Sequence, residues 1–167
     1  MSKSLGNTIL LKDAFAKRHP LVMRFFILQS HYRGTLDFTE AAMDGAAKGY
    51  EKILNTIRNL LSAVGPATAA EGARGVEPGS DPVPGNPPGP AAGFLRRFNE
   101  AMDDDFNTPQ AIAVLFDAAR EVNTLLASGT KDAAALSDYA RFYGETADCV
   151  LGLVPVRGAA GAGGSGG

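Results

Sequence analysis

A stretch rich in glycine and proline divides this chain into two parts. Residues 65–93 contain seven Gly and seven Pro, including the run PVPGNPPGP at 82–90. Proline removes the backbone donor that a helix requires, and glycine raises the entropic cost of ordering the backbone. We therefore expect a disordered Gly/Pro linker over residues 64–93, so that compact structure must come from the segments on either side.

The segment before this linker shows apolar residues at helical spacing. Residues 11–19 predict a short helix. Pro20 fits the first turn of a second helix, which runs to about Ser30, because the missing proline donor would be unpaired there in any case. Residues 38–61 predict a long helix with one apolar face and Thr39 as its N-cap.

The segment after the linker has the same character. A short stripe covers residues 94–102, and a helix capped by Asn107 or Thr108 follows, with Pro109 in its first turn. A last helix is expected from 132 to 151. Since no segment alternates with a period of two, the predicted fold is an all-α bundle of five to six helices.

Composition excludes several classes of protein. The single cysteine, Cys149, cannot form an intramolecular disulfide, and with only two His it cannot complete a structural zinc site. We interpret Cys149 as a small apolar core residue on a helix. The longest apolar block, 21–28, is interrupted by Arg24 and is too short to span a bilayer. We expect a soluble, cytoplasmic chain without a signal peptide.

Charge is distributed unevenly along the chain. The formal net charge is −2, which does not suggest a general nucleic-acid binder. Residues 1–58, however, carry nine Lys and Arg against five Asp and Glu, whereas the remainder carries seven against thirteen. This pattern suits a polyanion that contacts only the first part, although ordinary scatter of surface charge would also produce it.

Three short motifs occur in order. The first, MSKSLGN at 1–7, resembles the end of the Lys-Met-Ser-Lys-Ser loop of class I aminoacyl-tRNA synthetases. The second, HYRGTLDF at 31–38, and the third, MDDDFNTP at 102–109 with its continuation FDAAREVN at 116–123, resemble segments of cysteinyl-tRNA synthetases. The resemblance covers residues 1–63 and 94–153.

The resemblance implies a division of the chain and a site. Residues 1–63 would hold the signature loop and stem-contact helices, residues 94–153 a helical tRNA-binding part of the anticodon-binding type, and residues 154–167 a flexible Gly/Ala tail. Lys3 would be the catalytic lysine, because a cation on a mobile loop can neutralise the pyrophosphate that leaves when an adenylate forms. ATP contacts are expected from the signature-loop residues Met1, Ser2, Lys3 and Ser4.

The same resemblance implies a larger enzyme. The family joins cysteine to cysteine tRNA with ATP, and it holds the cysteine thiolate through zinc in a catalytic domain. We expect the present chain to begin inside the signature loop, to lack that domain and its zinc, and to have no metal site of its own. Alone, it should be an inactive monomer that supplies Lys3 and a platform for tRNA.

The predicted tRNA contacts are His31, Tyr32, Arg33 and Lys52. His31 has a structural or tRNA-contacting role, Tyr32 belongs to the core or stacks on nucleic acid, and Arg33 pairs with phosphate or with Asp37.

The aspartates at 103–105 suggest metal ligands or, in our preferred interpretation, favourable charges and caps near a helix start. A rival hypothesis for the whole chain is a stand-alone, non-enzymatic helical module that recruits a protein through a helical groove.

The two interpretations of Arg33 predict different results for Arg33→Ala. If the guanidinium binds phosphate, the substitution should weaken binding to cysteine tRNA and flatten its salt dependence by roughly one phosphate contact. If it only pairs with Asp37, the melting temperature should fall and the salt slope should stay unchanged. Thermal unfolding and salt-dependent tRNA binding, measured on one preparation, separate the two.

Overall fold

The computed structural model describes residues 19–30, 34, 39–65, 89–129 and 132–155. Over these ranges the chain forms five α-helices and one π-helical segment, and no strand is present among them. The elements are α2 (Pro20–Gln29), α3 (Glu40–Val64), α5 (Ala92–Asp103), α6 (Thr108–Ala127), α7 (Ala133–Tyr143) and η1 (Gly144–Val150). The predicted all-α fold is therefore confirmed. In the described part, no helix is long and apolar enough to cross a membrane.

The helices before the linker begin where the sequence predicts. Pro20 is the first residue of α2, and the His19 side chain accepts a hydrogen bond from the Leu21 amide. Thr39 caps α3, since its Oγ1 accepts from the Ala42 amide at 3.2 Å. The predicted short helix over 11–19 lies outside the described residues, apart from His19.

Helix α6 also begins with a cap that the sequence predicts. Asn107 Oδ1 accepts from the Gln110 amide at 3.2 Å, and Pro109 lies in the first turn of α6. The linker is shorter than predicted, because α3 extends to Val64 and α5 begins at Ala92. Residues 66–88 of the predicted linker and 156–167 of the predicted tail lie outside the described residues.

The last predicted helix differs from the structure. Instead of continuing from 132 to 151 as one α-helix, the chain changes to π-helical geometry after Tyr143. The Thr146 hydroxyl donates to the Phe142 carbonyl at 2.7 Å, so a side chain competes for a carbonyl that an α-helical amide would otherwise use. A threonine hydroxyl that bonds to a carbonyl in this way weakens the α-helical backbone hydrogen bonds of the last turns.

Two further predictions about single residues were wrong. Cys149 is exposed on η1 instead of being buried in the core. The aspartates at 103–105 do not cap a helix start: Asp103 ends α5, Asp104 is its C-cap, and the cap of α6 comes from Asn107. Asp105 and Phe106 form a tight turn with positive φ values of 54° and 52° between the two helices.

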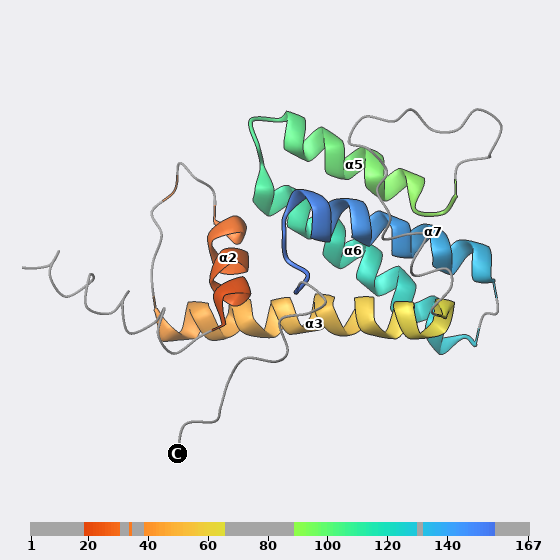
Figure 1. The fold of residues 1–167 in the computed structure, drawn as a ribbon. Helices are drawn as coiled ribbons and strands as arrows, with labels where there is room; N and C mark the ends of the chain where they lie inside the picture. Colours follow the sequence, from red (N-terminus) through yellow and green to blue (C-terminus); the bar gives the residue numbers. More distant parts are fainter. Residues whose placement is uncertain (1–18, 31–33, 35–38, 66–88, 130–131, 156–167) are drawn as a thin grey trace, which may run out of the picture.

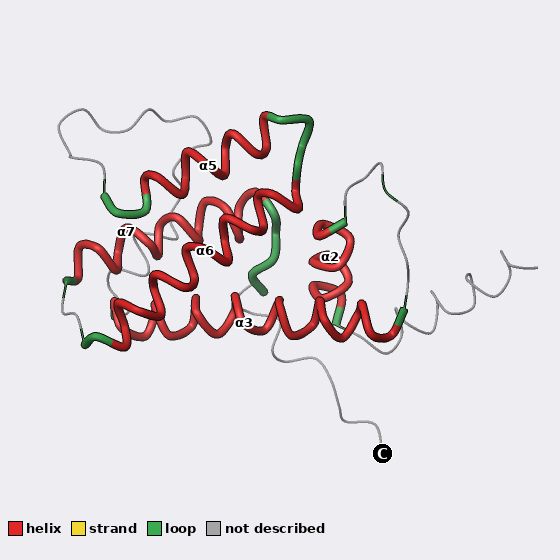
Figure 2. The backbone as a smooth tube through the Cα atoms, turned by 180° about the vertical axis from the view of Figure 1, so that it is seen from behind, coloured by secondary structure: helices red, strands yellow, loops and turns green. Residues whose placement is uncertain are grey.

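The long helix α3 forms one side of the bundle (Figure 1). Helices α2, α6 and α7 pack against it, and α5 packs on α6 and α7 on the side away from α3. The view from behind shows the same order, with α6 and α7 between α3 and α5 (Figure 2). The core is the apolar space between these layers, where Phe25, Leu60 and Leu115 have no exposed surface.

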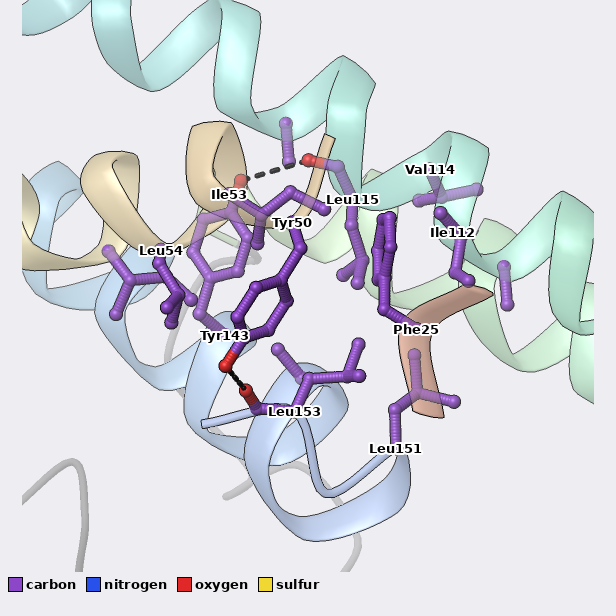
Figure 3. Close-up of a cluster of buried hydrophobic side chains, with 14 of the residues drawn as sticks. Phe25, Tyr50, Ile53, Leu54, Ile112, Val114, Leu115, Tyr143, Leu151 and Leu153 are labelled. Atoms are coloured by element: carbon purple, nitrogen blue, oxygen red, sulfur yellow. Dashed lines mark hydrogen bonds between the residues drawn. The ribbon is translucent and has the colours of Figure 1, made fainter. Parts of the chain in front are cut away.

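Two buried tyrosines tie distant parts of the chain together (Figure 3). The Tyr50 hydroxyl of α3 donates to the Leu153 carbonyl at 2.9 Å, and the Tyr143 hydroxyl of α7 donates to the Leu115 carbonyl of α6 at 3.0 Å. In each case the buried tyrosine hydroxyl gains an acceptor, and leaving such a hydroxyl buried without a partner would cost more than the bond itself contributes. The segment after η1 is thereby fixed against α3.

These tyrosines predict a loss of stability in alkali. Burial raises the pKa of both Tyr50 and Tyr143 above the ordinary value of 10.0. Above pH 10 the unfolded chain therefore binds fewer protons than the folded chain, and the free energy of unfolding should fall as pH rises. The slope should be up to about 1.4 kcal/mol per pH unit for each tyrosine. Urea unfolding at pH values on both sides of 10 measures it.

The matched variants are Tyr50→Phe and Tyr143→Phe, which remove one ionisable group each. Both should lower stability at neutral pH and make the alkaline decline shallower. Burial also raises the pKa of Tyr139, so part of the decline should persist in each variant. An equally steep decline in both variants would contradict this origin.

Candidate nucleic-acid interface

Of the predicted functional residues, the structure describes only Lys52, which is exposed on α3. The predicted ATP contacts, which include the predicted catalytic lysine, lie outside the described residues: Met1, Ser2, Lys3 and Ser4. The other predicted tRNA contacts also lie outside them: His31, Tyr32 and Arg33. The site is therefore built outward from Lys52.

Lys52 lines an open polar hollow of about 360 Å³ between α3 and α6. All but one of its lining residues come from α3, and the exception, Asn123, comes from α6. The full set is Lys48, Glu51, Lys52, Asn55, Thr56, Asn59 and Asn123. We call this the α3–α6 hollow.

The helical period explains why these residues gather. Lys48, Lys52, Asn55 and Asn59 follow one another at intervals of four, three and four residues, so at 3.6 residues per turn they project within roughly 60° of the helix circumference. This arc lies opposite the face of α3 that carries Tyr50 into the core. The burial of one face thus directs these four side chains outward.

The two lysines are free cations within the described part of the chain. Neither ammonium lies within ion-pair distance of a carboxylate there, and both side chains are exposed. The hollow contains one acid, Glu51, against these two lysines, so its lining carries a formal charge of +1. Such a surface attracts an anion without being strongly basic.

The arginines after the linker behave differently, because every one in the described part is paired with a carboxylate. Their N–O distances are 3.9 Å for Arg96–Glu100, 2.8 Å for Arg97–Asp117, 2.9 Å for Arg120–Asp117 and 3.1 Å for Arg141–Glu145. Cations that are already neutralised offer less to an incoming polyanion. This contrast selects the α3–α6 hollow as the candidate contact surface.

The floor of the hollow is held in place by hydrogen bonds. Thr56 is 2% exposed, and its hydroxyl donates to the Lys52 carbonyl at 3.0 Å. The same oxygen accepts from Asn123 Nδ2 at 3.1 Å, which links α3 to α6. Asn123 is half-buried, so this bond fixes its carboxamide before any ligand arrives.

Sequence reasoning identified Lys52 but missed Lys48, Asn55, Asn59 and Asn123. The first three could have been found from their spacing around Lys52 on the polar face of the predicted helix. Asn123 could not, because it lies in a different helix and only the packing of α6 on α3 brings it there.

A second hollow, of about 400 Å³, lies where α2 meets the ends of α5 and η1. Its lining is about half apolar and includes Leu28, Met102 and the exposed Cys149. The cation there, Arg24, donates to the Gly152 carbonyl at 3.1 Å. Among the described residues no group of three or more His, Cys, Asp or Glu is arranged to hold a metal ion.

Comparison with known families matches both ends of the described bundle. Residues 1–48 match the family described as the tRNA synthetases class I (C) catalytic domain, and residues 97–155 match the DALR domain. Together the two ranges cover more than half of the chain. The chain thus belongs to the class I aminoacyl-tRNA synthetases, with one part that matches a catalytic domain and another that matches a DALR domain.

Individual relatives narrow the class. A protein from Chlorobium chlorochromatii is 45% identical over 128 residues, which cover 77% of this chain and 23% of the relative. One from Chlorobaculum tepidum is 40% identical over 157 residues (94% and 28%), and one from Geobacter sulfurreducens is 41% identical over 153 residues (92% and 30%). Each is named cysteine–tRNA ligase. The chain belongs to the cysteinyl-tRNA synthetase family, and it spans less than a third of the length of these relatives.

Proposed function

We propose that this chain is the tRNA-binding helical portion of a cysteine–tRNA ligase, an enzyme that activates cysteine with ATP and transfers it to cysteine tRNA. The observation that carries the proposal is the presence of two lysines, Lys48 and Lys52, without an ion-pair partner among the described residues, on a helix that begins within the catalytic-domain match and ends before the DALR match. One chain matches both a synthetase catalytic domain, over residues 1–48, and a DALR domain, over residues 97–155. This combination favours a synthetase over the stand-alone interaction module.

In this proposal the signature-loop residues and the α3–α6 hollow have different roles. Lys3 neutralises charge on the departing pyrophosphate, with Met1, Ser2 and Ser4 beside it against ATP. The α3–α6 hollow, together with His31, Tyr32 and Arg33, binds the sugar-phosphate backbone of the tRNA. Zinc and the cysteine site belong to the catalytic domain of the longer enzyme. A cytoplasmic location and a monomeric state remain predictions.

Contacts to phosphate position the tRNA and carry no sequence information. The hollow should therefore contribute similarly to the binding of cysteine tRNA and of a non-cognate tRNA. Discrimination between tRNAs would come from other parts of the enzyme.

The test is salt-dependent binding of the chain to cysteine tRNA. Lys48→Ala and Lys52→Ala should each weaken binding and reduce the slope of log affinity against log salt by roughly one, because each removes one phosphate contact. The double variant should lose both contributions. Fluorescence anisotropy at several salt concentrations measures the slope.

Arg141→Ala is the matched control. This arginine is also exposed on a helix, but it already pairs with Glu145 at 3.1 Å, so its removal should change neither affinity nor slope. Unchanged slopes in Lys48→Ala and Lys52→Ala, or an equal loss in Arg141→Ala, would remove the tRNA-binding role of the hollow.

A further inference from the structure

Asparagine is concentrated in the α3–α6 hollow. The described α-helices contain four asparagines, Asn55, Asn59, Asn99 and Asn123, and all but Asn99 line this one hollow. Asparagine is a poor helix former, because its side chain competes for the backbone. Helix stability therefore does not explain why three carboxamides share this surface.

The three carboxamides are not equally engaged. Asn55 Oδ1 accepts from Arg58 Nη1 at 3.4 Å, and Asn123 Nδ2 donates to Thr56 Oγ1 at 3.1 Å. Asn59 is exposed, and its side chain forms no hydrogen bond to any described residue. Asn59 thus presents a free donor and a free acceptor, about one helical turn beyond Asn55 and two turns beyond Lys52 on the same face of α3.

We propose that the α3–α6 hollow distinguishes RNA from DNA, with Asn59 as the residue that recognises a ribose 2′-hydroxyl. This inference rests on the proposed function and adds the chemical group that is recognised. A 2′-hydroxyl both donates and accepts, and a carboxamide can do the same in return. Lys48 and Lys52 hold the neighbouring phosphates.

The shape of the hollow favours the sugar over the base. Double-stranded RNA presents its 2′-hydroxyls in a wide, shallow minor groove, whereas its major groove is too deep and narrow for side chains to read. An open depression along one helix, of about 360 Å³, fits a shallow surface of this kind. A flipped base would require an enclosed pocket with stacking rings, and no aromatic side chain lines the hollow.

The weak net charge of the hollow suggests that hydrogen bonds from the carboxamides contribute to binding. Because Glu51 offsets one of the two lysines, phosphate attraction is modest and acts on DNA and RNA alike. A ligand that carries a hydroxyl beside its phosphate uses both kinds of side chain, the lysines for the phosphate and the carboxamide for the hydroxyl.

The experiment compares two probes on the same protein. One is a fluorescein-labelled RNA hairpin with the sequence of the cysteine tRNA anticodon arm, and the other is the DNA hairpin of the same sequence. Wild-type chain should bind the RNA more tightly. Asn59→Ala should weaken RNA binding by roughly threefold to tenfold, the factor that corresponds to one hydrogen bond, and leave DNA binding unchanged.

Two variants serve as controls. Asn99→Ala removes an exposed asparagine from α5, outside the hollow, and should leave both affinities unchanged. Lys52→Ala should weaken RNA and DNA binding by the same factor. Unchanged circular dichroism and melting temperature in Asn59→Ala would confirm that the loss is not a loss of fold.

The outcomes separate this inference from the proposed function. If Lys52→Ala lowers tRNA affinity but Asn59→Ala leaves the RNA-to-DNA ratio as in wild type, the hollow binds phosphate only and the inference is overturned alone. Equal binding of the two hairpins by wild type would also overturn it. If the wild-type chain binds neither cysteine tRNA nor the RNA hairpin, both proposals are overturned.

Discussion

The rest of the structure depends on the burial of one face of α3. Met43, Tyr50, Ile53, Ile57 and Leu60 of this helix are all at most 6% exposed, and each complete burial of such a side chain contributes about 1.5–3 kcal/mol. Most of the stability of a helix in a folded protein comes from tertiary packing of its apolar face. Helices α2, α6 and α7 supply that packing.

The same burial determines the polar surface. A helix whose core face is fixed cannot rotate, so the side chains on the opposite arc stay where the helical period places them. The Asn123–Thr56 bond adds a polar contact between α6 and α3 at the edge of this arc. The candidate interface is therefore rigid because it lies on the back of a core helix, and a rigid surface loses less entropy when it binds.

Local signals predicted most of the helices. Pro20, Thr39, Asn107 and Asp132 each lie at a helix start, and the side-chain oxygens of the last three accept amide hydrogen bonds there. These signals involve residues within three positions of each other, so the sequence alone contains them. The same holds for the spacing that places Asn59 near Lys52.

Features that depend on distant residues were not predictable in the same way. The Tyr50–Leu153 bond joins residues 103 positions apart, and the Asn123–Thr56 bond joins residues 67 apart. The chain changes to η1 where the buried Thr146 hydroxyl donates to the Phe142 carbonyl, and Cys149 in this segment is exposed. The α-helical spacing of apolar residues predicts a buried face only over the residues that keep α-helical geometry.

The position of α3 also bears on how the two matched families are joined. Its first residues fall within the catalytic-domain match, which ends at Lys48, and the helix continues unbroken to Val64. Phe25 of α2 contacts both Tyr50 of α3 and Phe116 of α6, with ring centroids 5.8 and 6.2 Å apart.

These contacts leave little freedom between α2 and the DALR-matched helices, because a close-packed core resists sliding. An RNA held on the outer face of α3 would then have a fixed position relative to α2. No hinge between the two matched regions is needed for this, because α3 continues unbroken from the catalytic-domain match towards the DALR-matched helices.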